Sequence, residues 1–300
     1  MGSRLLGGLP PRFGAASLEA GWRSAGRLFG PGAPLGRVPV WPGLATRCEL
    51  LGSHLQRVCG PGLRAGVLDE LVAEALASYG RYWAESLRLG GVPAGELLAD
   101  LEVTGLEHLD EALGLGRGAI LVLPHLGGWD WGGGYLAARG YRVSVVVEAL
   151  RPPEVQEWFA GLRGGLGLEV IAAGPGAARS CLGALGDNRV LCLLADRVVP
   201  GVAGVEVGLF GSPALLPAGP ATLALRTGAP AMAAAVYFRR GRPGHHAVLG
   251  ATLPMARSGR FGDDVLAGTR LVAGALEGLI RAAPTQWHAL HPVWTDELDG

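Results

Sequence analysis

The residues His125 and Asp130 have the types and the spacing of a general-base pair. They stand at the two ends of the segment His-Leu-Gly-Gly-Trp-Asp, which follows the apolar run 118–124. A histidine at the exit of a buried strand can accept a proton, and a carboxylate one helical turn further on can fix its tautomer and stabilise its protonated form. The two glycines between them allow a substrate to approach the backbone. The segment therefore predicts acid–base chemistry at the end of a strand.

Other charged residues stand next to neighbouring apolar runs. Glu148 follows the run 143–147, Asp196 and Arg197 follow the run 190–195, and Glu206 lies near the start of the run 205–210. Reactive groups cluster at the carboxyl ends of strands in open α/β sheets. We therefore expect these residues to share one cleft with His125.

The elements that must position these residues change character near residue 101. The first hundred residues are predicted to be helical, because apolar and aromatic side chains recur at three- and four-residue spacing between Leu68 and Leu87. From residue 101 onward, strands and helices alternate. The predicted strands are 101–104, 119–123, 142–147, 168–171, 190–195, 205–210, 231–238 and 246–253, and the predicted helices are 106–115, 153–164, 177–186, 217–227 and 263–282.

Several of the predicted strands are continuous apolar runs, as expected when helices cover both faces of a sheet. The predicted fold class is therefore α/β, with a mixed central sheet flanked by helices on both faces and a helical N-terminal subregion. No linker is long enough to divide the chain. We expect a single domain over residues 1–300, with a helical subregion at 1–100 and an α/β core at 101–300.

The composition excludes several classes of function. The 300 residues carry a formal net charge of zero, so there is no overall electrostatic case for binding nucleic acid. The chain contains no lysine, which excludes a Schiff-base lysine and a phosphate-loop lysine. The four cysteines form no CxxC pair and are interpreted as free, buried thiols.

The sequence also bears on membrane attachment. No segment reaches the roughly 18 to 20 uninterrupted apolar residues of a membrane span. On a helix, Leu18, Trp22 and Phe29 would fall near one face, with Arg23 and Arg27 elsewhere. This arrangement suits a helix lying on an anionic membrane surface, and it suits equally an amphipathic helix packed on the body of the protein.

Metal-dependent and hydrolase chemistry are not indicated. His288 and His291 have near-helical spacing but no evident third ligand, and His245 and His246 are interpreted as part of a basic turn between two strands. No Gly-x-Ser-x-Gly motif occurs, which argues against an α/β-hydrolase. We expect no metal and no bound cofactor.

Taken in order along the chain, these segments resemble the bacterial lipid A acyltransferase-like family. The resemblance rests on His125-x4-Asp130 after an apolar strand, on Glu148 after three valines, and on Ala-Asp-Arg at 195–197. It also rests on Gly-Val-Glu-Val-Gly-Leu-Phe-Gly at 204–211, Pro-Ala-Gly-Pro-Ala-Thr-Leu-Ala at 217–224 and Pro-Thr-Gln-Trp-His at 284–288. The Val-Glu-Val segment and Tyr-x-x-Tyr-Trp-x-Glu at 79–85 are most similar to the actinobacterial branch, which contains phosphatidylinositol mannoside acyltransferases.

The resemblance implies transfer of a fatty acyl group from acyl-CoA to a glycolipid hydroxyl, by a peripheral enzyme at the cytoplasmic face of the cell membrane. In the mannoside branch the hydroxyl is on mannose. By position, the resemblance assigns His125 as the catalytic histidine, Asp130 as the motif aspartate and Glu206 as the acid that pairs with the histidine. It assigns Glu148 and Arg163 as further site residues. The chain departs from the family's Asp-Arg-Asp pattern, because Val198 follows Arg197.

Acyl transfer from a thioester needs a base for the attacking hydroxyl and stabilisation of the oxyanion, and it needs no metal. His125 is the expected base, and either Asp130 or Glu206 would receive its other ring N–H. The N–H groups near Gly127 and Gly128 are expected to face the oxyanion.

The remaining site residues are expected to bind the two substrates. Arg163 or Arg197 would meet the phosphates of CoA or an acceptor phosphodiester, and Glu148 would orient sugar hydroxyls. The helix with Tyr79 and Trp83 is a candidate wall for the acyl chain. Two alternatives stay open: acylation of another glycolipid, and a non-catalytic lipid-binding homologue.

Overall fold

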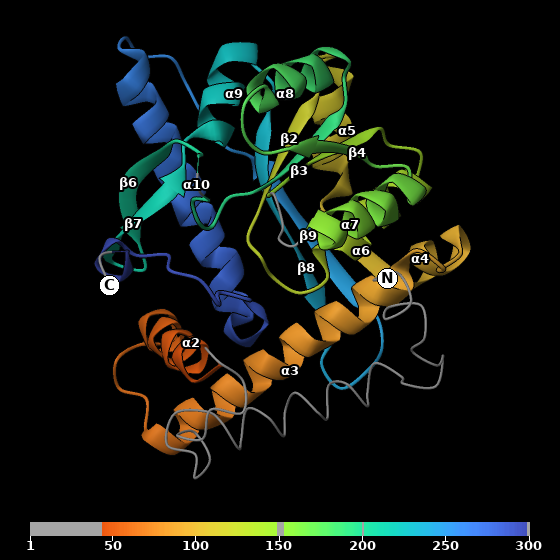
Figure 1. Cartoon of the computed structure of the whole chain (residues 1–300). Coiled ribbons are helices and arrows are strands. Elements are labelled where there is room, and N and C mark those ends of the chain that lie inside the picture. Colours follow the sequence, from red (N-terminus) through yellow and green to blue (C-terminus); the bar gives the residue numbers. More distant parts are fainter. Residues whose placement is uncertain (1–43, 149–152, 200, 299–300) are drawn as a thin grey trace.

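The central feature of the computed structural model is a twisted sheet enclosed by helices (Figure 1). The structure describes residues 44–148, 153–199 and 201–298. Within them, seven strands form one sheet in the order β1-β9-β8-β2-β5-β3-β4. Strands β8, β2, β5, β3 and β4 are mutually parallel, β9 runs antiparallel to β8, and β1 is parallel to β9. The predicted mixed α/β fold is confirmed.

The strands lie close to their predicted positions. Their bounds are β1 Leu101–Thr104, β2 Ala119–Leu123, β3 Val143–Val147, β4 Glu169–Ala172, β5 Val190–Leu194, β8 Ala231–Phe238 and β9 His245–Thr252. Strand β2 is buried at all five positions, which explains its continuous apolar sequence. Its neighbours β8 and β5 cover both of its edges, and helices cover both of its faces.

Helices pack on both faces of the sheet. On one face lie α5 (Leu106–Gly114), α6 (Trp129–Ala138) and α7 (Pro153–Gly165), against Leu121 and alternate residues of the neighbouring strands. The opposite face is covered by α8 (Ala177–Gly186), α9 (Gly219–Thr227) and α10 (Phe261–Ala282). These helices pack against Ile120 and against the residues of the neighbouring strands that point to the same face. Successive side chains of a strand point to opposite faces, so two separate cores form.

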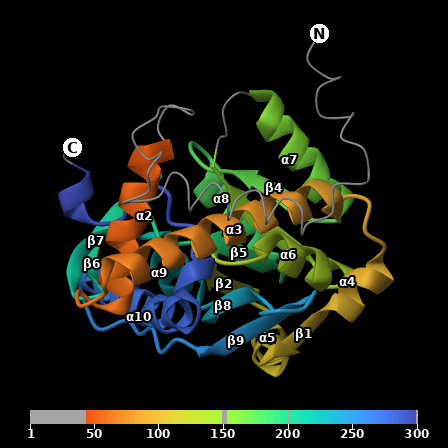
Figure 2. The same cartoon turned by 90° about the horizontal axis from the view of Figure 1, so that it is seen from below.

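The helical N-terminal subregion is present within the described residues. It comprises α2 (Leu44–Cys59), α3 (Ala65–Leu89) and α4 (Ala94–Asp100). Figures 1 and 2 show α3 as a long helix running across one side of the molecule, with α2 packed beside it. The segment Leu18–Phe29, predicted to be amphipathic, lies outside the described residues. In the part of the chain that is described, none of the helices combines the length and the apolar character needed to cross a membrane.

One predicted strand does not join the central sheet. Strand β6 (Gly204–Leu209) pairs with β7 (Ser212–Pro217) in a separate two-stranded antiparallel sheet. The connection is Phe210-Gly211, and both residues have positive φ, as a tight two-residue hairpin turn requires. Strand β7 is not predicted from the sequence, because proline argues against a strand. Here Pro213 and Pro217 are tolerated in a short strand of a two-stranded sheet, whose other edge forms a single bridge, between Ala214 and Trp294.

Candidate functional site

The side chain of His125 forms a dyad with Asp196. Strand β2 ends at Leu123 and its parallel neighbour β5 ends at Leu194, and these two residues are paired in register. The residues that follow the two strands therefore meet at the same edge of the sheet. The Nδ1 atom of His125 lies 2.6 Å from Oδ1 of Asp196. His125 is 21% exposed and Asp196 only 3% exposed, so the base faces the solvent side of the dyad.

Asp196 is held as an ionised acceptor. Its Oδ2 atom accepts hydrogen bonds from the backbone N–H of His125 at 3.0 Å and from the indole N–H of Trp287 at 2.7 Å. Burial alone would raise the pKa of Asp196, but the charge of His125 and these hydrogen bonds lower it to about 2. An ionised Asp196 accepts the Nδ1 proton of His125, which leaves Nε2 as the nitrogen with a free lone pair.

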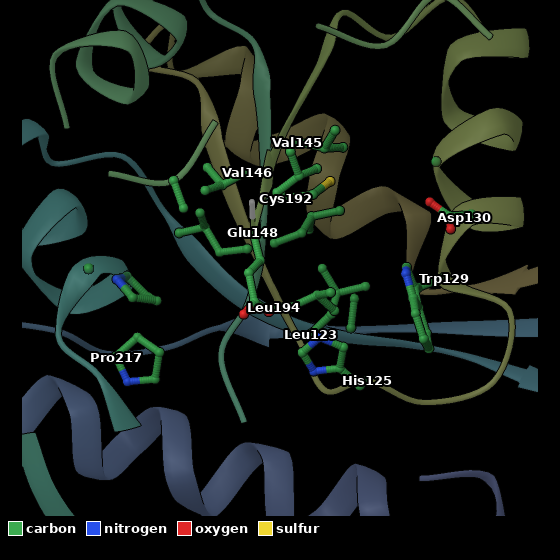
Figure 3. Close-up of a pocket in the computed structure, with 18 of the residues that line it drawn as sticks. Leu123, His125, Trp129, Asp130, Val145, Val146, Glu148, Cys192, Leu194 and Pro217 are labelled. Atoms are coloured by element: carbon green, nitrogen blue, oxygen red, sulfur yellow. The ribbon is translucent and has the colours of Figure 1, made fainter. Parts of the chain in front are cut away.

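The predicted partners of His125 are therefore corrected, beginning with Asp130. Asp130 is the second residue of α6 and is buried. Its two oxygens accept hydrogen bonds from Nε and Nη2 of Arg163, at 2.9 and 3.2 Å, and from the hydroxyl of Tyr82 at 2.9 Å. Figure 3 shows Asp130 apart from His125, with Trp129 nearer the histidine. Asp130 thus ties α6 to α3 and α7.

Glu206 is also not the partner of His125. It lies on β6 opposite Leu215, its side chain is exposed, and it is not among the residues that line the cavity described below. The expectation that Glu206 shares the cleft assumed that residues 205–210 form a strand of the central sheet. Strand β6 belongs instead to the separate hairpin, and the carboxylate that His125 contacts is that of Asp196.

The two glycines after His125 serve the fold and not the approach of a substrate. Gly127 has a φ of +60°, and a Cβ atom there would lie 2.0 Å from the carbonyl oxygen of Val236. The N–H of Gly127 donates to the carbonyl of Gln286, and that of Gly128 donates to the carbonyl of Val236. Both N–H groups are therefore occupied, and the predicted oxyanion site at these two glycines is not formed.

Glu148 and Arg197 form an ion pair close to the dyad. Glu148 follows β3, Arg197 follows Asp196, and Nη2 of Arg197 donates to Oε2 of Glu148 at 2.7 Å. Their side chains are 34% and 16% exposed, respectively. The ends of β3 and β5 bring the two charges together, as strand-end clustering predicted. Both residues remain accessible to a polar ligand.

A largely apolar cavity of about 580 Å³ opens beside the dyad. Of the six predicted site residues, five line it: His125, Asp130, Glu148, Arg163 and Arg197. Much of its wall is formed by apolar side chains along β2, β3 and β5, including Leu123, Val145, Cys192 and Leu194 (Figure 3). Tyr79, Tyr82 and Trp83 of α3 also line it, so this helix forms part of the cavity wall.

Sequence reasoning missed the supporting residues on the C-terminal segment. Trp287 donates to Asp196, and the backbone N–H of His288 donates to the carbonyl of His125 at 2.7 Å. The ring of His288 is buried against Ser78, and desolvation lowers its pKa to about 3, so it is neutral near pH 7. The motif at 284–288 marks this segment in the sequence. The contacts that the segment makes with residues 125–127 depend on the tertiary fold and cannot be predicted from the motif.

The predicted basic turn at His245 is corrected as well. His245 begins β9 and is buried, with Nδ1 3.1 Å from Asp100 and Nε2 2.8 Å from Glu85. Its ring stacks on Trp131 of α6 at 4.7 Å. The side chain of His245 therefore joins α3, α4 and α6. No cluster of three or more metal-ligating side chains occurs among residues 44–148, 153–199 and 201–298.

The low pKa of Asp196 predicts a loss of stability in acid. Because the pKa in the folded state, about 2, lies below the usual value of 3.8, Asp196 stabilises the fold above pH 4, and this contribution is lost as the pH falls toward 2. The full loss is on the order of 2 kcal/mol. We expect the urea concentration at the midpoint of unfolding to fall more steeply below pH 4 for the wild type than for Asp196→Asn. Parallel pH profiles for the two proteins would contradict this.

Comparison with known proteins shows the family to which the chain belongs. The sequence model of the bacterial lipid A biosynthesis acyltransferase family matches residues 54–296. A phosphatidylinositol mannoside acyltransferase of Mycobacterium tuberculosis (strain H37Rv) is 39% identical over 83% of this chain and 78% of its own length. A protein of the same name from Mycolicibacterium smegmatis is 34% identical over 99% of this chain and 90% of its own length. With a family match that covers most of its length and includes the dyad, the chain belongs to the bacterial lipid A biosynthesis acyltransferase family.

Proposed function

We propose that this protein is a membrane-associated O-acyltransferase that transfers a fatty acyl group from acyl-CoA to a mannose hydroxyl of a phosphatidylinositol mannoside. The observation that carries the proposal is the His125–Asp196 dyad at an apolar cavity large enough for an acyl chain. The names of the two mycobacterial relatives, both phosphatidylinositol mannoside acyltransferases, support the choice of acceptor. The enzyme would act as a peripheral protein on the cytoplasmic face of the cell membrane.

In the proposed reaction, Nε2 of His125 removes the proton of the acceptor hydroxyl, and the hydroxyl oxygen attacks the thioester carbonyl carbon. Asp196 stabilises the imidazolium that forms, as the acid does in a catalytic triad. The carbon–sulfur bond then breaks, the CoA thiolate takes the proton from His125, and the acyl ester is released. The dyad thus serves as base and then as acid, and no cofactor besides the co-substrate acyl-CoA takes part.

The charged groups near the dyad have proposed roles in binding the acceptor. Glu148 can accept hydrogen bonds from sugar hydroxyls, while the remaining N–H groups of Arg197 can meet a phosphate. The N-terminus of α6, which begins at Trp129, contributes partial positive charge near the reacting carbonyl. Arg163 is less suited to bind phosphate, because its guanidinium is already paired with Asp130.

The test is release of CoA from palmitoyl-CoA by the purified protein, measured with and without acceptor. We expect release to depend on added phosphatidylinositol mannoside, and mass spectrometry to find one acyl group added to that lipid. Phosphatidylinositol without mannose serves as the control acceptor. Transfer to a lipid A precursor but not to the mannoside would favour the alternative glycolipid. Binding of lipid with no acyl transfer to any acceptor would favour the non-catalytic homologue.

A further inference from the structure

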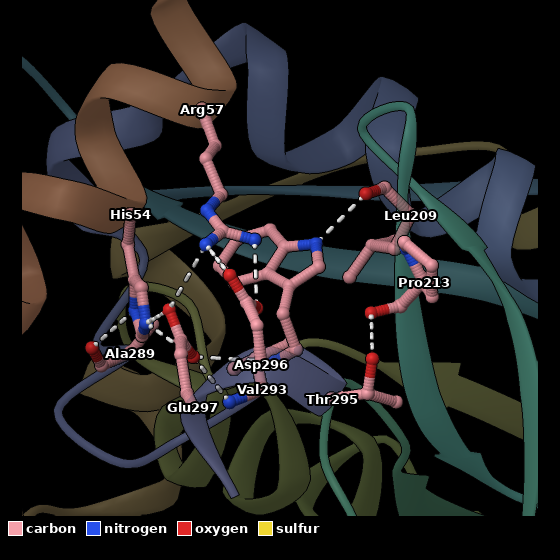
Figure 4. Close-up of polar contacts among 10 residues, drawn as sticks. His54, Arg57, Leu209, Pro213, Ala289, Val293, Thr295, Asp296 and Glu297 are labelled. Atoms are coloured by element: carbon pink, nitrogen blue, oxygen red, sulfur yellow. Dashed lines mark hydrogen bonds and ion pairs between the residues drawn. The ribbon is translucent and has the colours of Figure 1, made fainter. Parts of the chain in front are cut away.

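A buried histidine fastens the C-terminal segment that supports the dyad. His54 of α2 is fully buried. Its Nδ1 atom lies 2.9 Å from the carbonyl oxygen of Ala289, and its Nε2 atom lies 3.0 Å from Oε2 of Glu297. Figure 4 shows both contacts reaching across from α2 to the end of the chain. Residues more than 230 positions apart in the sequence are joined here.

Both ring nitrogens of His54 face hydrogen-bond acceptors. The carbonyl oxygen of Ala289 can only accept a hydrogen bond. The carboxylate of Glu297 is also an acceptor, and it accepts further hydrogen bonds from the backbone N–H groups of Val293 and Trp294. Burial would raise the pKa of Glu297, but the hydrogen bonds from His54 and Val293 lower it below its usual value. Both ring nitrogens of His54 are thus placed to donate, and breaking this buried contact with the carboxylate of Glu297 is costly.

The ring of His54 also packs against the residue that holds Asp196. It stacks on Trp287 with ring centroids 5.8 Å apart and meets the edge of Trp294 at 4.9 Å. Trp287 donates to Asp196, and its neighbour His288 donates to the backbone of His125. A continuous set of contacts therefore runs from α2 through Trp287 to both members of the dyad.

We propose that His54 is a positioning residue for the acyl transfer: by fixing Ala289 and Glu297 to α2, it sets the indole of Trp287 and thereby the geometry of the His125–Asp196 hydrogen bond. The inference rests on the proposed function for its kinetic consequence. His54 is not among the residues that line the cavity. Its effect is therefore on the rate of the chemical step and not on the binding of acyl-CoA.

The test uses the full chain with His54→Phe, which keeps a ring between the two tryptophans but removes both donors. We expect kcat to fall about 10- to 100-fold, as for a small misplacement of catalytic groups, while KM for palmitoyl-CoA stays within about twofold. In the protein without substrate, we expect the downfield proton resonance of the His125 Nδ1–H to shift or broaden. Circular dichroism confirms that the variant is folded.

Two further variants keep the test decisive. Glu297→Gln keeps the size of the side chain but removes the charge that faces His54, and the same losses are expected. Asp296→Asn is the matched control, because this neighbouring acid is 64% exposed and binds Arg57 at the surface. It should behave as wild type. If His54→Phe does not fold, Glu297→Gln decides alone.

Wild-type kcat and an unchanged His125 resonance in either folded variant would overturn the inference, as would equal losses in Asp296→Asn. The resonance is measured without substrate. It therefore tests the positioning role even if the wild type transfers no acyl group, an outcome that would contradict the proposed function instead.

Discussion

Replacing His125 with alanine is expected to lower kcat by about 10²- to 10⁴-fold, the contribution of a positioned general base. Asp196→Asn is expected to cause a loss of similar size. An amide at position 196 can donate a hydrogen bond to Nδ1 of His125. The ring proton then lies on Nε2, and this nitrogen no longer has the free lone pair that a base needs. The same acid-to-amide change in a serine-protease triad lowers kcat by about 10⁴-fold.

Two features make this prediction specific. Since the two residues act as one unit, the double variant should be hardly slower than His125→Ala alone. KM for acyl-CoA should change little in Asp196→Asn, because the side chain of Asp196 is buried and does not line the cavity. Steady-state release of CoA with saturating acceptor measures both quantities.

Glu206→Gln is the control for the dyad prediction, because the sequence assigned to Glu206 the role that the structure gives to Asp196. Its side chain is exposed on the hairpin, so wild-type kcat is expected. A large loss in Glu206→Gln together with near-normal activity in Asp196→Asn would show that the dyad is not the working pair.

The sequence predicted the fold well because its signals are local. The continuous apolar run of β2 and the helical periodicity of α3 each depend on residues close together in the chain. The exception is β7, which contains two prolines and is therefore not predicted to be a strand. Boundary differences of one or two residues, as at β4 and α9, leave the topology unaffected.

The partner of His125 could not be found in this way. Asp196 was recognised as a strand-end residue, but its pairing with His125 depends on β2 and β5 being neighbours, 71 residues apart. Asp130 is a candidate from the sequence because it is only five residues from His125. The start of α6 turns its side chain toward Arg163 and Tyr82 instead. Sequence spacing thus identified His125 as the candidate base and located the strand ends. Which of Asp130, Asp196 and Glu206 pairs with His125 depends on the order of the strands in the sheet.

The Asp130–Arg163 pair is expected to make a large contribution to stability. Both side chains are largely buried, at 6% and 11% exposed, and both oxygens of Asp130 are engaged. Arg163→Met would leave a buried carboxylate with only the hydroxyl of Tyr82 as its partner. We expect the free energy of unfolding, measured in urea, to fall by about 3–5 kcal/mol. Arg142→Met is the matched control, because Arg142 and Asp187 are both exposed, and a loss of at most about 1 kcal/mol is expected.

A second variant distinguishes this structural role from phosphate binding by Arg163. Adding Asp130→Asn to Arg163→Met removes the unpaired charge, so the double variant should recover much of the lost stability. Because the His125–Asp196 hydrogen bond does not involve either residue, the folded double variant should keep most of its kcat. If Arg163→Met instead unfolds as the wild type does and raises KM for acyl-CoA more than tenfold, Arg163 binds the phosphates of CoA. The ion pair with Asp130 would then contribute little to stability, because removal of a guanidinium that stabilises the fold must lower the free energy of unfolding.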